Sequence, residues 1–219
     1  MDADFWKQRW QTNEIGWHEG RTNTMLAQYW PSRRLPAGSQ VFVPLCGKSA
    51  DMAWLAAQGH RVLGAELSEI AVATFFAENG LTPEREIRDG FEVSSAGGIE
   101  IWCGDFFKLK TSHLADVAGV YDRAALVAMP PTMQPAYAAK MAEIVPRGVP
   151  TLLITFTLDE AQPSGPPFST PPARVRTLFE ANFEISEIES RDTDEVSVNL
   201  RQRGVERMQQ HAIVLLRRR

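Results

Sequence analysis

Four charged residues stand within two positions of the end of short apolar runs that are typical of buried strands, namely Glu66, Asp105, Asp122 and Arg123. A carboxylate in such a place can accept hydrogen bonds from both hydroxyl groups of a ribose, and we expect this role for Glu66, although it could also be a surface residue before a helix. Asp105 can accept a hydrogen bond from the amino group of adenine, or cap the turn that follows it. Arg123 can hold a carboxylate through two parallel hydrogen bonds, or pair with a neighbouring acid. The set predicts a ligand that combines a nucleoside with a carboxylate.

The stretch VFVPLCGKS, residues 41–49, ends like a phosphate-binding loop, but its spacing does not fit one. That loop needs a glycine five residues before Gly47, and the residue there is Phe42. The dinucleotide pattern of three spaced glycines is absent too, because 44–46 reads Pro-Leu-Cys. A kinase that binds a nucleoside triphosphate is therefore disfavoured. The stretch indicates either a tight turn that brings the backbone close to a small ligand, or a plain connection between a strand and a helix.

S-adenosylmethionine has the chemical parts that these residues would recognise. It carries a ribose, an adenine and a free amino-acid carboxylate, and it has no phosphate that would require a glycine-rich loop. We therefore predict S-adenosylmethionine as the cofactor and S-adenosylhomocysteine as its product.

The elements that must position these residues alternate between strands and helices. Strands are predicted at 41–43, 61–65, 99–103, 119–121, 151–157, 183–189 and 211–216, and helices at 50–58, 68–77, 135–145 and 174–182. The proline-rich stretch 163–172 is predicted to be a loop. This alternation predicts an α/β fold with a mostly parallel sheet covered on both faces, whose ligands lie beyond the carboxyl ends of the strands. No helical pattern separates the last two strands, so we expect a closing hairpin with the final strand antiparallel at or near the sheet edge.

Length, charge and cysteine usage limit the possible classes of protein. The chain has 219 residues and a formal net charge of −4, which favours one globular domain and gives no basic surface for nucleic acid. Its two cysteines, Cys46 and Cys103, predict neither a disulfide scaffold nor a metal site. The charged, aromatic N-terminus does not resemble a signal peptide, and no apolar run is long enough to span a membrane. We expect a cytoplasmic monomer with no membrane partner.

Five segments together resemble the thiopurine S-methyltransferase family, within the class I S-adenosylmethionine-dependent methyltransferases. They are FWKQRW at 5–10, VFVPLCGKS at 41–49, GAELSE at 64–69, YDRAALVA at 121–128 and GPPF at 165–168. The resemblance implies a Rossmann-like, seven-stranded sheet with the last strand antiparallel, in a single domain 1–219 whose residues 1–30 form a lid over the cofactor. It also implies a cofactor site of Trp10, Leu45, Glu66, Asp105, Phe106 and Arg123, and contacts of Trp17 and Phe168 with the substrate.

The activity that the resemblance implies is methylation of the sulfur of thiopurines and of aromatic or heterocyclic thiols. In bacterial members it extends to compounds of selenium and tellurium. Mammalian members have phenylalanine where this chain has Trp17, which leaves the preferred substrate open. The alternative is a sensor module that binds the cofactor and catalyses nothing.

Transfer of a methyl group to a thiolate requires little acid–base chemistry. Aromatic thiols ionise easily, so the main contribution of the protein is to align the reactants in a dry site. His18 and Asp122 are weak candidates for a catalytic role, because a single histidine in a polar loop is more often structural and Asp122 could pair with Arg123 instead.

Overall fold

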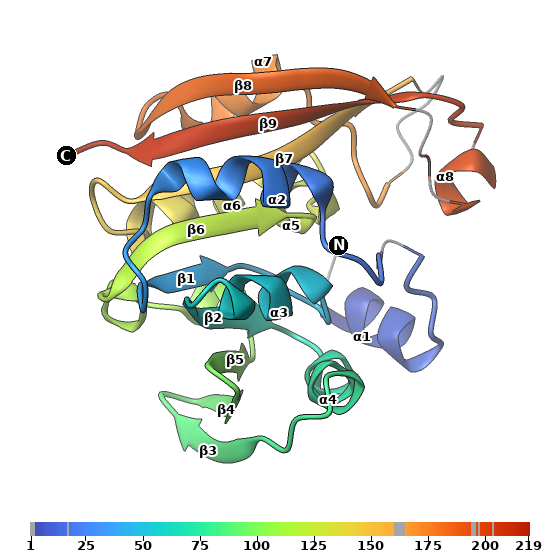
Figure 1. Cartoon of the computed structure of the whole chain (residues 1–219). Helices are drawn as coiled ribbons and strands as arrows, with labels where there is room; N and C mark the ends of the chain where they lie inside the picture. The colour runs from blue at the N-terminus through green and yellow to red at the C-terminus, as the bar shows by residue number, and fades with distance from the viewer. Residues whose placement is uncertain (1–2, 17, 160–164, 194–195, 197, 203) are drawn as a thin grey trace.

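The computed structural model describes residues 3–16, 18–159, 165–193, 196, 198–202 and 204–219 (Figure 1). In these residues nine strands form one sheet in the spatial order β3-β4-β5-β2-β1-β6-β7-β9-β8. Its parallel centre consists of β5 (Ile99–Cys103), β2 (Arg61–Glu66), β1 (Gln40–Val43), β6 (Val117–Arg123) and β7 (Pro150–Leu158). Antiparallel pairs flank it, β3 (Glu84–Arg88) with β4 (Phe91–Ala96) on one side and β8 (Phe183–Thr193) with β9 (Met208–Arg217) on the other. The predicted α/β fold with a mostly parallel sheet is confirmed.

The predicted number of strands is wrong, because the hairpin of β3 and β4 extends the sheet from seven strands to nine. All of β3 is exposed, so its sequence, EREIR, lacks the apolar alternation of a half-buried strand. The turn between the two strands does carry a recognisable pattern. Asp89 and Gly90 have φ angles of +50° and +84°, as a two-residue hairpin turn requires.

The end of the chain also differs from the prediction. β9 is antiparallel and lies one strand from the sheet edge, between β7 and the edge strand β8, as predicted for a final strand at or near that edge. A short helix, α8 (Val198–Gln202), stands between β8 and β9, where no helix was predicted. With five residues, α8 is too short for a helical period to be recognised in the sequence.

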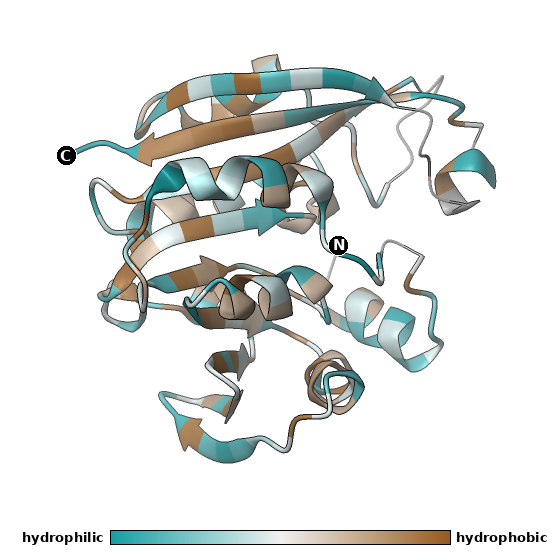
Figure 2. Ribbon diagram, viewed as in Figure 1, coloured by the Kyte–Doolittle hydropathy of each residue, from teal (hydrophilic) through white to brown (hydrophobic). Residues whose placement is uncertain are grey.

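Two hydrophobic cores fill the two faces of the sheet, and successive residues of a strand alternate between them. On β1, Phe42 packs into one core, whereas Val41 and Val43 pack into the other. The Phe42 core is covered by α6 (Gln134–Ile144) and α7 (Pro172–Phe179). The opposite core is covered by α2 (Thr24–Tyr29), α3 (Ala50–Ala57) and α4 (Glu69–Glu78). Figure 2 shows hydrophobic residues concentrated in the central strands and in α4, and alternating bands along β8.

The helices after β1 and β2 begin and end within one residue of their predicted bounds. Ser49 caps α3 by accepting a hydrogen bond from the Asp51 backbone N–H at 3.2 Å. Ser68 caps α4 in the same way, from Ala71 at 3.3 Å. Capped starts fix where each helix leaves the sheet, and therefore fix the loops that face the site.

Two segments far apart in the sequence lie at the same edge of the sheet. α1 (Ala3–Gln11) and α8 both stand beyond the arrowheads of the parallel strands (Figure 1). The carboxyl ends of β1, β2, β5 and β6 therefore face a space that is flanked by N-terminal and C-terminal residues. Among the helices of the described residues, none is both long and apolar enough to cross a membrane.

Candidate functional site

A cavity of about 1060 Å³ opens beyond the carboxyl ends of the parallel strands. Its lining includes seven of the residues predicted for the site, namely Trp10, His18, Leu45, Glu66, Asp105, Phe106 and Arg123. They come from α1, the loop after it and the ends of β1, β2, β5 and β6. The fold thus brings the predicted cofactor residues together in one place.

Glu66 ends β2 and is buried, with 6% of its surface exposed, so the surface alternative is wrong. Its Oε2 accepts a hydrogen bond from the Gly47 backbone N–H at 2.9 Å, and its Oε1 accepts one from Ser68 at 2.8 Å. Burial raises the pKa of the Glu66 carboxyl above its ordinary value, while these backbone hydrogen bonds act in the opposite direction. One carboxylate therefore joins the loops after β1 and β2. Since a carboxylate can accept about four hydrogen bonds, it retains acceptor sites for a ligand in the cavity.

The turn after β1 has an unusual backbone that brings it close to α1. Leu45 and Gly47 have φ angles of +46° and +53°, a region that L side chains rarely occupy. A Cβ on Gly47 would lie 3.3 Å from Cζ2 of Trp10, whose ring is buried with 7% exposure. Glycine thus permits both the φ angle and the contact with Trp10. The turn is as tight as predicted, and its approach to a small ligand stays a prediction.

The Gly-Lys-Ser sequence in this loop has structural partners. Lys48 Nζ pairs with Glu78 Oε1 on α4 at 2.6 Å, and Ser49 caps α3. The Gly47 N–H donates to Glu66, so a phosphate placed there would meet a carboxylate instead of a free donor. Each residue of the Gly-Lys-Ser sequence therefore has a structural role, and none of these roles requires a bound phosphate.

At the end of β5, Asp105 caps the turn that follows, as one of its two predicted roles. Its Oδ1 accepts a hydrogen bond from the Phe107 backbone N–H at 2.9 Å, while the residue still lines the cavity. Phe106 is buried at 3% exposure and stacks on Tyr137 of α6, with ring centres 5.2 Å apart and planes 25° apart. Phe106 is thus held as a fixed apolar wall at this end of the cavity.

At the end of β6, the Arg123 guanidinium forms an ion pair with the Glu19 carboxylate, from the loop between α1 and α2. The alternative role predicted for Arg123, a pair with an acid, is therefore present, although Glu19 was not among the predicted residues. Ala124 follows with a φ angle of +74° and, like both charged residues, lines the cavity. Strained non-glycine residues often occur at ligand sites, and both Leu45 and Ala124 line this cavity.

The side chain of Asp122 points away from the cavity, into the protein. Its side chain accepts hydrogen bonds from Tyr137 Oη at 2.7 Å and from the Leu126 backbone N–H at 3.3 Å, and among the described residues it is not part of the cavity lining. Burial raises the pKa of Asp122 to about 6, with both hydrogen bonds acting against this shift. Asp122 therefore holds Tyr137 in place, and Tyr137 stacks on Phe106, which lines the cavity.

One part of the cavity lining is a group of apolar side chains, beside Gln202 and Gln210, and the sequence analysis missed most of it. Its side chains come from β7, β9, α8 and the segment between α5 and α6, and they are Met129, Met133, Phe156, Leu200 and Met208. No single segment carries them, so no sequence pattern joins them. The GPPF loop contributes Gly165, Pro166 and Pro167.

Phe168 lies behind that loop. A Cβ on Gly165 would meet the Phe168 ring at 2.4 Å, and the Phe168 backbone N–H donates to Val127 O at 2.7 Å. Within the part of the chain that the structure describes, Phe168 is not a lining residue, so its contact with substrate stays a prediction.

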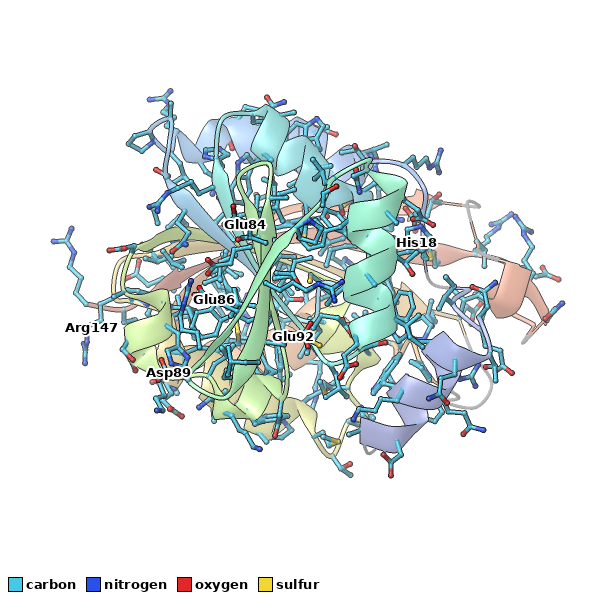
Figure 3. The ribbon with its side chains drawn as sticks, turned by 90° about the horizontal axis from the view of Figure 1, so that it is seen from below. His18, Glu84, Glu86, Asp89, Glu92 and Arg147 are labelled. Carbon is cyan, nitrogen blue, oxygen red and sulfur yellow. The ribbon has the colours of Figure 1, made fainter. Side chains whose placement is uncertain are left out.

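His18 and the tryptophans lie on the N-terminal side of the cavity. His18 is half-buried and lies apart from the labelled glutamates of the β3–β4 hairpin (Figure 3). Burial lowers the pKa of His18, and the nearby charge of Lys48 lowers it further, so the imidazole is neutral at pH 7. Trp6 lines the cavity together with Trp10. Trp17, predicted to contact substrate, lies outside the described residues.

Metal ions have no evident place in this arrangement. In the described ranges, no three histidine, cysteine or acidic side chains come together as a metal site would require. Cys103 is also unsuited to reaction as a thiolate, because burial raises its pKa to about 12.

Comparisons with known proteins match the whole chain. The family model described as thiopurine S-methyltransferase matches residues 1–219. The thiopurine S-methyltransferase of Pseudomonas syringae pv. pisi is 44% identical over 217 residues, which cover 99% of this chain and 100% of that protein. The one of Pseudomonas paraeruginosa is 47% identical over 218 residues, with 100% of both chains covered.

Solved structures with the same fold are more distant in sequence. A SAM-dependent methyltransferase from Anabaena variabilis superposes with a TM-score of 0.64 at 13% identity, covering 99% of this chain and 95% of that one. A Haemonchus contortus phosphoethanolamine N-methyltransferase, solved with S-adenosylhomocysteine, gives a TM-score of 0.65 at 10% identity, covering 92% and 54% of the two chains. At such identities the likeness concerns the fold.

Proposed function

This chain belongs to the thiopurine S-methyltransferase family, and we propose that its cavity holds S-adenosylmethionine at one end and an aromatic or heterocyclic thiol at the other. The chain is an S-adenosylmethionine-dependent methyltransferase that acts on the sulfur of thiopurines. What remains to be assigned is which residues of the cavity perform each part of this reaction.

The order of the strands supports the placement of the cofactor. Asp105 and Phe106 follow β5, Glu66 ends β2, Leu45 follows β1, and Arg123 ends β6, and these four strands are neighbours in that order. Adenine against Phe106, ribose on Glu66 and the amino-acid carboxylate on Arg123 would therefore follow one another along the sheet edge, in the order in which they are bonded in the cofactor. Neighbouring strands are about 4.8 Å apart, so the four ends span about 14 Å.

Trp10 completes this half of the site. Its ring lies on Gly47, so α1 covers the loop after β1. We infer that residues 1–30 act as a lid over the cofactor within a single methyltransferase domain. The aromatic rings of Trp6 and Trp10 suit a site that receives a cation, because the faces of aromatic rings attract positive charge.

When bound, S-adenosylmethionine supplies an electrophilic methyl group on a sulfonium. The residues of the chain contribute by aligning the acceptor sulfur and by excluding water. Met129, Phe156 and Met208 form the apolar walls that would do so, together with Pro166 and Pro167. His18, neutral at pH 7, can accept the proton of a thiol that is not already ionised. An aromatic thiol needs little such help, so we assign His18 no essential role.

The single observation that carries this proposal is the buried carboxylate of Glu66, fixed by two backbone N–H groups at the edge of a mostly apolar cavity. Two experiments test it. Titration with S-adenosylhomocysteine should release measurable heat, and incubation with labelled S-adenosylmethionine and a thiopurine should give the methyl thioether. The corresponding hydroxypurine is the control acceptor and should remain unlabelled. Absence of binding at millimolar ligand would refute the proposal, and binding without transfer to any thiol would favour the sensor instead.

We also propose methylation of selenium and tellurium compounds. The observation that favours it is the presence of three methionines, Met129, Met133 and Met208, in the lining of the cavity. Methionine side chains are polarisable and adapt their shape, which suits the larger and softer anions of heavier chalcogens. Labelled cofactor mixed with methylselenol should yield labelled dimethyl selenide. A yield no higher than in the absence of protein would contradict this extension but leave the thiol activity intact.

A further inference from the structure

Glu19 lies at the mouth of the cavity in an ion pair with Arg123 that the mechanism above does not use. The pair joins Oε1 of Glu19 to Nη2 of Arg123, and both residues line the cavity. The Arg123 side chain is 14% exposed, whereas that of Glu19 is 43% exposed. The arginine is thus set in the wall, and the glutamate reaches it from the edge that a ligand would pass.

The loop that carries Glu19 is anchored to the sheet. Four residues along the chain, the Asn23 backbone N–H donates to Oδ1 of Asp51 at 2.7 Å. Oδ2 of Asp51 accepts a hydrogen bond from Tyr121 Oη at 2.9 Å, and Asp51 is 1% exposed. Tyr121 precedes Arg123 by two residues on β6. The same strand therefore positions both the arginine and, through Asp51, the loop that brings Glu19 to it.

The charges of this pair are complementary to one kind of ligand group. A guanidinium has five N–H donors in a fork, more than one carboxylate oxygen uses. A second carboxylate could bind beside Glu19, but two anions on one cation would repel each other. A positive charge next to Glu19 would relieve this repulsion. A ligand end that carries a carboxylate and an ammonium on the same carbon, as an α-amino acid does, supplies both charges.

We propose that Glu19 binds the α-ammonium of the cofactor while Arg123 binds its α-carboxylate. This proposal rests on the function proposed above and assigns one more residue to the same site. Before the cofactor arrives the two side chains neutralise each other, and afterwards each holds the opposite charge of a zwitterion. Glu19 is thus a specificity-determining residue. It favours adenosyl compounds that retain the complete amino-acid end over those that lack the ammonium.

Calorimetric titration of two variants with two ligands tests the assignment. The ligands are S-adenosylhomocysteine and its deaminated analogue, in which hydrogen replaces the α-amino group. The test variant is Glu19→Gln. The matched control is Glu187→Gln, which removes a carboxylate that is also 43% exposed from an ion pair with Arg176 at 3.1 Å, and neither of these two residues lines the cavity.

We expect Glu19→Gln to weaken S-adenosylhomocysteine binding about tenfold, as loss of one charge-assisted hydrogen bond implies. Binding of the deaminated analogue should change less than twofold, and Glu187→Gln should leave both affinities within twofold of wild type. Glu19→Asp, which keeps the charge on a shorter side chain, should fall between wild type and Glu19→Gln. A thermal melt of each variant verifies folding.

Three results would overturn the proposal. Tighter S-adenosylhomocysteine binding by Glu19→Gln would make Glu19 a competitor of the ligand carboxylate. Equal weakening of both ligands would make it a support of the loop only, and unchanged affinity would leave it no role in binding. Failure of the wild type to bind either ligand is a separate outcome, which removes the proposed function itself and this assignment with it.

Discussion

Replacing Glu66 by glutamine tests the placement of the ribose most directly, because it removes a charge while keeping the size of the side chain. The carboxylate accepts hydrogen bonds from the Gly47 and Ser68 backbone N–H groups at 2.9 and 2.8 Å. A glutamine has one acceptor oxygen, so one of these N–H groups would face the amide nitrogen. A buried donor left unsatisfied costs about 1–3 kcal/mol. The burial that raises the Glu66 pKa shows that the ionised carboxylate also has a desolvation cost, which the variant avoids. We therefore expect the free energy of unfolding to fall by no more than about 2 kcal/mol.

Cofactor affinity should fall more clearly than stability. If the carboxylate accepts both ribose hydroxyls, the variant loses at least one charge-assisted hydrogen bond, worth about 1.5–3 kcal/mol. The dissociation constant for S-adenosylhomocysteine should therefore rise by about 10- to 150-fold. Calorimetric titration measures it, and denaturant unfolding of the same sample shows how much of the protein is folded. Glu69→Gln is the matched control, since Glu69 is exposed in the first turn of α4 and should leave the affinity within twofold.

The pH dependence adds an independent measurement. Burial raises the pKa of Glu66, so this carboxylate becomes protonated at a higher pH than an ordinary glutamate does. As the pH falls, the wild type should therefore lose affinity for S-adenosylhomocysteine at a correspondingly higher pH. The Glu66→Gln variant should lack this step. A folded Glu66→Gln protein that binds S-adenosylhomocysteine within threefold of wild type would refute the ribose assignment.

Three other substitutions test the packing around the site. Asp122→Asn should remove a pH dependence of stability, because burial raises the pKa of Asp122 to about 6. The stabilisation from the protonated Asp122 carboxyl is fully present below the ordinary pKa of 3.8 and is lost as the pH rises through 6. Denaturant unfolding should show the wild type losing about 2 kcal/mol relative to this variant between pH 4 and pH 7, and parallel curves would contradict the burial argument. Gly47→Ala should destabilise the protein by about 1–2 kcal/mol and weaken S-adenosylhomocysteine binding, because φ is +53° and the new Cβ would lie 3.3 Å from Trp10. Gly38→Ala, at φ +79° with open space around it, is the control that should cost stability alone; equal ligand affinity in both variants would remove the role of the Trp10 contact. Ala124→Gly should leave the melting temperature unchanged or raise it, since glycine relieves the strain of φ +74°, and a clear drop would show that no strain is stored there.

The sequence predicts the part of the fold that depends on local pattern. Residues 41–43, 61–65 and 99–103 are short apolar runs with turns or caps after them, and the structure has strands in all three places. Parallel strands place their carboxyl ends at one edge, so Glu66 and Arg123 could be expected together although 57 positions separate their numbers. The prediction failed where a strand buries no face, as β3 shows, or where an element is very short, as α8 shows.

Long-range packing explains what sequence reasoning missed in the site. Met129 and Met208 line the same cavity although they come from different parts of the chain, and nothing near either residue in the sequence indicates the other. A mostly buried arginine such as Arg123 needs an acidic partner, and Glu19 fills that role. The sequence alone could not single out Glu19, because several other glutamates could also have been the partner. Phe168 has the side chain that a substrate wall requires, yet its ring packs on Gly165.

The position of β9 has a consequence for how the protein is made. A nascent chain that has left the ribosome only as far as β8 leaves the edge of β7 uncovered and has no partner for β8, because β9 pairs with both. Ala212 and Ile213 of β9 also belong to opposite cores, so both layers stay incomplete until that strand arrives. Synthesis on the ribosome therefore cannot finish the sheet piece by piece from its start. The sheet can be completed only after β9 has been synthesised, because β8 joins the rest of the sheet through β9.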